Sequence, residues 1–289
     1  MKKILLLTDL SEVSRNTLQF ARSFFSDTLV DFHLLCVHPA EPNSQHNPIL
    51  AVKLPRSPYA DQLTGVVSEL RREVTNDWHT FRSTACPGQL SEVVQRLLEA
   101  ERYDFVVVGT NPGDANESFG NGAIALIRQL NANVLVVPVD AHPRLVRQVV
   151  LAADFANLDN AKLLNPVKEL VTLKGAALIL LTIDTPGKDI IYMEREAHIR
   201  QFLAPVVPTI ARLRADSAKQ GVDAYLAGHP VDLLVTIPRR NGGTEALTED
   251  SATHAQPFSP PVLLLTLYDD GSNDHPQPVN EQSAMEYAL

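Results

Sequence analysis

The sequence has few of the residues that would point to disulfide, metal or membrane chemistry. Its 289 residues include only two cysteines, Cys36 and Cys86, and one tryptophan. No Cys and His spacing matches a metal site, and no run of about 18 apolar residues predicts a membrane-spanning helix. The first apolar run is ended by Asp9 and is too short for a signal peptide. We therefore expect a cytoplasmic protein.

Positive charge is also scarce. The chain has 25 Lys and Arg against 34 Asp and Glu, a net charge of −9, whereas a nucleic-acid partner would require a basic face. From Tyr268 onward there is no Lys or Arg. Because this stretch also contains Pro276 and Pro278, residues 268–289 are predicted to be an acidic flexible tail.

The first half alternates short apolar runs with helical patterns. The expected strands are residues 4–9, 31–38, 80–85, 105–110 and 134–138. Between them lie a helix capped by Ser11 and two amphipathic patterns that begin near Leu63 and Leu90. Strands separated by helices predict parallel pairing with right-handed crossovers.

The same pattern restarts about 145 residues later. The run from Ile4 to Asp9 is echoed from Val149 to Asp154, and the later strands have counterparts as well. The sequence thus predicts two tandem Rossmann-like α/β units. The expected division is 1–140 for the first domain, 145–267 for the second and 268–289 for the tail.

The second half departs from the repeat in one place. Only four residues separate the apolar segment 223–227 from the strand at 232–235, and a parallel crossover needs about a dozen. Pro205 and Pro208 interrupt the preceding helical pattern. We therefore expect a degenerate second unit that lacks its third helix, with 223–227 as a displaced strand.

The candidate ligand site follows the strand at 105–110. Gly109, Gly113 and Gly122 precede a helical pattern, and backbone amides at such a helix start can hold a phosphate. No Gly-Lys-Ser/Thr follows, so this is not a Walker A loop. The run resembles the nucleotide loop of the universal stress protein family, Gly-x2-Gly-x9-Gly-Ser/Thr. Tandem members of that family resemble the whole order of elements over roughly residues 1–267.

The resemblance implies a stress-response protein that binds and regulates. It implies five parallel strands per unit in the order 3-2-1-4-5, with the units paired through their last strands, and homodimers are a further expectation. It also implies an adenine nucleotide such as ATP, with Mg²⁺ if bound, in the first unit. The residues carried over are Asp9 near the adenosine, the Val37 backbone at the adenine, and Gly109, Gly113, Gly122, Ala123 and Ile124 around the phosphates.

The phosphate loop also departs from the family pattern. Pro112 stands at a usual glycine position and lacks an amide donor, and Ala123 replaces the Ser or Thr. Asp114 and Glu117 add negative charge that no nearby Lys or Arg offsets.

Two alternatives therefore stay open beside nucleotide binding. One is a ligand-free interaction scaffold that acts as an internal or intermolecular pseudo-dimer. The other is a weak ATPase, which would need a general base, a cation and a metal. The sequence nominates no catalytic residue and no metal ligand.

Overall fold

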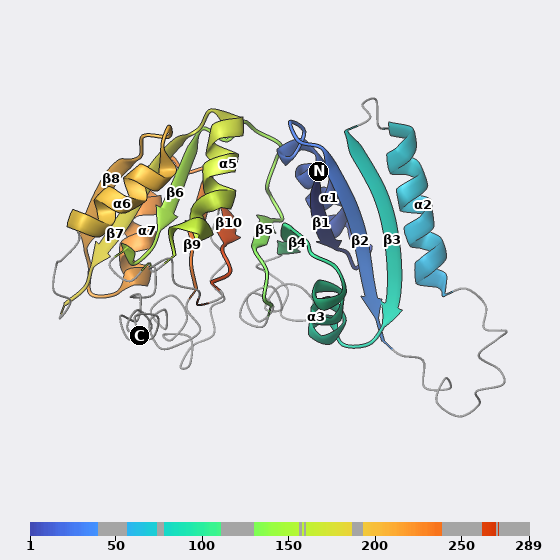
Figure 1. Ribbon diagram of the computed structural model, residues 1–289. Coiled ribbons are helices and arrows are strands. Elements are labelled where there is room, and N and C mark those ends of the chain that lie inside the picture. Colours follow the sequence, from blue (N-terminus) through green and yellow to red (C-terminus); the bar gives the residue numbers. More distant parts are fainter. Residues whose placement is uncertain are drawn as a thin grey trace, which may run out of the picture.

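The computed structural model describes residues 1–39, 57–73, 78–110, 130–155, 158, 160–186, 193–238, 262–269 and 271. These residues include ten strands, and helices lie between most successive strands (Figure 1). The strands are β1 (Lys2–Leu7), β2 (Val30–His38), β3 (His79–Pro87), β4 (Phe105–Thr110), β5 (Val134–Pro138), β6 (Gln148–Ala152), β7 (Ala177–Asp184), β8 (Thr209–Arg214), β9 (Leu233–Thr236) and β10 (Leu263–Thr266). The helices are α1 (Glu12–Phe24), α2 (Pro58–Glu73), α3 (Leu90–Ala100), η3 (Ala161–Leu164), α5 (Asn165–Lys174), α6 (Met193–Leu203) and α7 (Ala218–Gly228).

All ten strands form one sheet in the order β3-β2-β1-β4-β5-β10-β9-β6-β7-β8. Within each half the order is the predicted 3-2-1-4-5, and every pairing is parallel. The halves meet where β5 pairs antiparallel with β10, with Val134 opposite Thr266. This join puts the amino end of β5 beside the carboxyl end of β10, so opposite edges of the two half-sheets are neighbours.

The sheet is covered on both faces because its central strands are apolar on both sides. Ile4 and Leu6 belong to one buried cluster, and Leu5 and Leu7 belong to the other, as the period of two in a strand requires. Helices α1, α2, α5 and α6 contribute buried residues to the first cluster, and α3 and α7 contribute to the second. Both clusters contain residues of both halves, so each core runs across the join.

Among the described residues, two ion pairs also cross from one half to the other. Lys2 pairs with Glu169 of α5, and Lys174 of α5 pairs with Asp27 at a separation of 2.7 Å. At least one partner in each pair is more than half exposed. Exposed ion pairs contribute at most about 1 kcal/mol each, so the shared sheet and cores, rather than these pairs, hold the halves together.

The prediction that the second unit lacks its third helix is wrong. Residues 218–228 form α7, and the third strand of the unit is β8, which pairs with β7. Ser217 caps α7 by accepting a hydrogen bond from the Gln220 amide at 3.2 Å. Tyr225 and Val222 are buried one helical turn apart, which is the spacing of a helix face and not of a strand.

The error has two causes: residues 223–227 belong to α7 and not to a strand, and the two prolines do not interrupt a helix. Pro205 and Pro208 lie between α6 and β8, so they end one element and precede the next instead of interrupting a longer helix. Gly221 lets α7 approach the sheet, because a Cβ there would lie 2.5 Å from the Ile183 side chain of β7. The second half therefore has the same sequence of strands and crossover helices as the first over the described residues.

Part of the predicted organisation is not described. Of the acidic tail only residues 268, 269 and 271 belong to the described part. Within the described ranges, no helix has the length and apolar character needed to cross a bilayer.

Candidate functional site

The candidate site lies at the carboxyl edge of the first half-sheet, between β1 and β4. These strands are neighbours at the centre of the order 3-2-1-4-5, where the chain changes direction across the sheet. In open parallel sheets this switch point is where ligands bind. Asp9 follows β1, Gly109 and Thr110 end β4, and Val37 lies near the end of β2.

The turn after β1 fixes the position of Asp9. Its Oδ1 accepts a hydrogen bond from the Ser11 amide at 3.0 Å, and Leu10 between them takes a left-handed φ of 67°. Thr8 Oγ1 accepts from the Leu10 amide at 3.0 Å and donates to Ser14 Oγ at 2.9 Å. Ser11 caps α1 as predicted, by accepting from the Ser14 amide at 3.2 Å.

Of the two carboxylate oxygens of Asp9, only Oδ1 takes part in these hydrogen bonds. Oδ2 accepts no hydrogen bond from any described residue, and the side chain is half-buried. A carboxylate oxygen held rigidly at this edge can accept a hydrogen bond from a ligand hydroxyl group. Burial raises the pKa of the nearby Cys36 thiol, and the Asp9 charge raises it further. The thiol is therefore protonated and is not a nucleophile.

The structure gives Gly109 a packing role. A Cβ at this position would overlap the hydroxyl of Thr17 in α1 and would lie 3.3 Å from Val13 Cγ1. Thr17 Oγ1 is itself held in place, because it donates to the Val13 carbonyl at 2.8 Å. The close approach of α1 to β4 thus accounts for a glycine here without any phosphate. The same approach places α1 against β4 at the edge of the sheet where Asp9 lies.

Within the described residues, no strand pairs with the Val37 backbone on the side of β1. The register between β1 and β2 ends at Leu7 and Leu35, while β2 stays paired with β3 through Val37 opposite Cys86. The backbone amide of Thr8 donates to the Leu35 carbonyl at 2.9 Å. Because backbone groups of alternate residues point to the same side of a strand, those of Val37 point past the end of β1.

Comparisons with known proteins identify the first half. A sequence model of the universal stress protein family matches residues 1–138. This half of the chain is a universal stress protein domain. A search of curated proteins finds no match.

Solved structures extend the likeness of the universal stress protein fold to the second half. A universal stress protein from Archaeoglobus fulgidus DSM 4304 superposes with a TM-score of 0.69 at 14% identity, covering 92% of this chain and 97% of that one. A functionally unknown protein from Pseudomonas aeruginosa PAO1 superposes with a TM-score of 0.65 at 14% identity, covering 94% of both chains. At these identities the likeness is one of fold alone.

The structure brings together three of the predicted residues of the universal stress protein domain. Asp9, Val37 and Gly109 come from three different strand ends and lie at the same edge of the sheet. The remaining four residues predicted to lie around the phosphates are outside the described residues: Gly113, Gly122, Ala123 and Ile124. Pro112, Asp114 and Glu117 lie outside them too.

Sequence reasoning missed an aromatic pair at the same edge. The His38 ring, at the end of β2, stacks on Tyr59 at the start of α2, with centroids 4.5 Å apart and planes at 8°. His38 Nε2 lies 3.4 Å from Ser57 Oγ. No spacing in the sequence points to this pair, because the two rings belong to elements that only the crossover brings together.

Proposed function

We propose that the first half binds an adenine nucleotide in the crevice between β1 and β4, and that this binding is regulatory. Two groups at the switch point of the sheet carry the proposal. Asp9 Oδ2 accepts no hydrogen bond from a described residue, and no described strand pairs with the Val37 backbone on the side of β1. Asp9 would accept hydrogen bonds from the ribose hydroxyls, and the Val37 backbone would bond the adenine edge.

The energetics of the turn favour a site that exists before the ligand arrives. Asp9 is fixed by its bond to the Ser11 amide, and α1 is fixed against β4 by the fit between Gly109 and Thr17. A ligand that binds a preorganised site avoids the cost of ordering these groups. Bound at about 100 times its dissociation constant, it would stabilise the fold by roughly 2.7 kcal/mol.

Titration calorimetry of the full chain with ATP and Mg²⁺ tests the proposal, with AMP and Mg²⁺ as a second titration. Asp9→Asn is the informative variant, because its side-chain oxygen can still accept from the Ser11 amide while the charge is lost. We expect about fivefold weaker binding, since a bond to a charged group is stronger by about 1 kcal/mol than a neutral one. Glu12→Gln, exposed on α1, is the matched control and should bind as the unmodified chain does.

A ligand-free scaffold is the second candidate, and one observation favours it. Packing against Thr17 already explains Gly109, so this glycine does not require a phosphate. If neither nucleotide binds, or if Asp9→Asn binds as well as the unmodified chain, the scaffold replaces the nucleotide proposal. Measuring phosphate release in the same samples tests whether a bound ATP is hydrolysed.

A further inference from the structure

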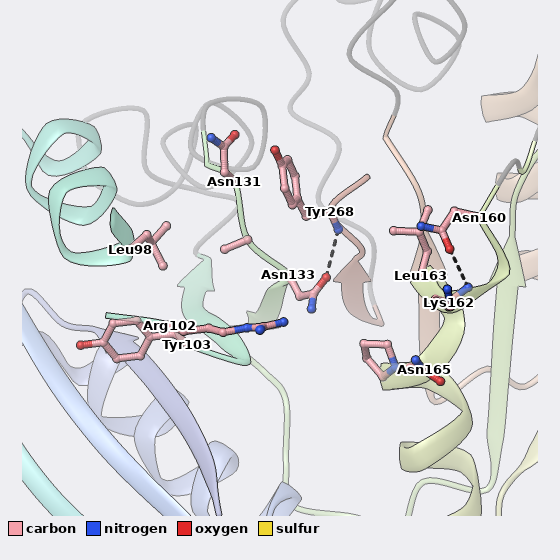
Figure 2. A pocket seen from close by; sticks show the side chains of 12 residues that line it. Leu98, Arg102, Tyr103, Asn131, Asn133, Asn160, Lys162, Leu163, Asn165 and Tyr268 are labelled. Carbon is pink, nitrogen blue, oxygen red and sulfur yellow. Dashed lines mark hydrogen bonds between the residues drawn. The ribbon is translucent and has the colours of Figure 1, made fainter. Parts of the chain in front are cut away.

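A second pocket lies at the join between the halves, away from Asp9 and Gly109. Its volume is about 590 Å³, within the range of small-molecule sites. One wall comes from the amino edge of the first half and the other from the start of η3 and α5 (Figure 2). The antiparallel pairing of β5 with β10 makes these two walls neighbours. We call this space the seam pocket; its described lining residues are Leu98, Arg102, Tyr103, Asn131, Ala132, Asn133, Asn160, Lys162, Leu163, Asn165, Pro166 and Tyr268.

The lining is cationic and rich in amides. Arg102 and Lys162 supply positive charge from opposite halves, and none of the described lining residues is Asp or Glu. That is unusual in a chain with a net charge of −9. Four asparagines supply both donors and acceptors, which suit hydroxyl groups.

Arg102 is the least constrained of these groups. It is exposed, and within the described part of the chain its guanidinium makes no hydrogen bond or ion pair. Figure 2 shows the side chain extending from the first half toward the second, with the guanidinium in the space between the two walls.

Neighbouring acids do not neutralise Arg102. Glu101 Oε1 accepts from Lys3 Nζ at 2.7 Å, and its Oε2 accepts from Arg82 Nη2 at 2.7 Å. Asp104 accepts from the Lys3 amide at 2.8 Å and pairs with Lys2 at 3.4 Å. The two carboxylates closest to Arg102 in the sequence, Glu101 and Asp104, thus form ion pairs with other cations. The Arg102 charge is available to a ligand in the seam pocket.

Two asparagines keep the walls in place. Asn133 donates through Nδ2 to the Asp104 carbonyl at 3.2 Å and accepts through Oδ1 from the Tyr268 amide at 3.0 Å. It therefore ties the first half to the segment that follows β10. Asn160 is buried, and its Oδ1 accepts from the Lys162 amide at 2.9 Å. These bonds hold Asn133 and Asn160 in position before any ligand enters.

We propose that the seam pocket binds a small phosphorylated polyol, with its phosphate between Arg102 and Lys162 and its hydroxyl groups on the asparagine amides. Guanidinium groups bind phosphate oxygens through paired, charge-assisted hydrogen bonds. The apolar surface of Leu98, Leu163 and Pro166 can pack against the carbon skeleton. A ligand in this place contacts both halves at once.

Calorimetric titration of the full chain with ribose 5-phosphate tests the proposal, with ribose as the uncharged control. Arg102→Gln should weaken binding about tenfold or more, since it removes a hydrogen bond to a charged group. Arg96→Gln on the exposed side of α3 makes the same substitution outside the pocket and should leave the affinity unchanged. The Nε–Hε resonance of Arg102, assigned by its loss in the Arg102→Gln spectrum, should shift during the titration.

The outcomes separate this site from the first one. Asp9→Asn should bind ribose 5-phosphate as tightly as the unmodified chain does. The proposal is overturned if Asp9→Asn abolishes the binding, if ribose binds as tightly as its phosphate, or if Arg102→Gln and Arg96→Gln behave alike. An absence of binding and of any Arg102 shift overturns it as well. None of these results depends on whether ATP binds between β1 and β4.

Discussion

Replacing His33 with glutamine should remove much of the dependence of folding stability on pH between pH 6.5 and pH 4. His33 lies on β2, and its side chain is buried, with 3% exposed. Its Nδ1 lies 2.6 Å from the Tyr103 hydroxyl oxygen and its Nε2 lies 2.7 Å from Thr84 Oγ1. The Tyr103 hydroxyl donates to Glu101 at 2.9 Å, so Nδ1 of a neutral His33 donates to Tyr103 and Nε2 accepts from Thr84.

The magnitude follows from the pKa of His33. Burial, followed by the charge of Arg82, lowers that pKa from 6.5 to about 4 in the fold. Between these values the unfolded chain binds more protons than the folded one, so stability rises with pH. The contribution is complete above pH 6.5 and is lost as the pH falls toward 4. A change of about 2.5 pKa units corresponds to roughly 3 kcal/mol.

The pKa values of Glu101 and Tyr103, which lie near His33, are shifted away from that of His33. The pKa of Glu101 is lowered to about 2, mainly by its hydrogen bond from Lys3 and to a smaller extent by those from Arg82 and Tyr103. The pKa of Tyr103 is raised to about 12, chiefly by burial. Asp31 and Arg82 form an ion pair at 3.0 Å. The Glu101 contribution is lost as the pH falls from 4.5 toward 2, which is mostly below the His33 range.

Urea unfolding at constant ionic strength, repeated from pH 7 to pH 4, measures the effect. The unmodified chain should lose up to about 1.4 kcal/mol per pH unit more than His33→Gln does. His142→Gln, an exposed substitution, should keep the slope of the unmodified chain. Equal slopes for the unmodified chain and His33→Gln would refute the reasoning, whatever the absolute stability of the variant.

Two further substitutions test the packing of the two halves. Gly109→Ala should lower the free energy of unfolding, measured in urea, by about 1–3 kcal/mol, because its Cβ overlaps the Thr17 hydroxyl. Adding Thr17→Ala should recover part of that loss. If the losses of the two single variants simply add in the double variant, the overlap is not the cause. Ser217→Ala should cost about 1 kcal/mol through loss of the α7 cap, whereas Ser26→Ala, outside any helix, should cost less. Equal effects of the two serine changes would argue against α7 as described.

Local pattern predicted most of the fold. Alternating apolar runs and helical spacings were enough for the duplication, the parallel strands and the β1-to-α1 turn capped by Ser11. The universal stress protein resemblance added the strand order and the pairing of β5 with β10. The error fell where local signals conflict. The short segment 209–214 alternates only weakly and does not predict the edge strand β8, whereas the apolar residues of α7 favour a strand when only the sequence is considered.

In the candidate nucleotide site, too, some features are visible in the sequence and others only in the structure. Asp9 was found because a carboxylate after a strand and before a helix cap is visible in the sequence, and strand order then places it at the switch point. Gly109 was found for its phosphate chemistry, yet the tertiary structure gives it a packing reason in Thr17, far from it in the chain.

The seam pocket and the His33 network had no sequence signal at all. Arg102 and Lys162 lie in different halves, and only the antiparallel join of β5 and β10 brings their elements together. His33, Thr84 and Tyr103 come from three separate strand regions. Sequence by itself determined the elements and their repeat, because these depend on periodicities within a few residues. Tertiary structure decided which distant side chains meet, because that depends on how the two half-sheets pack and join.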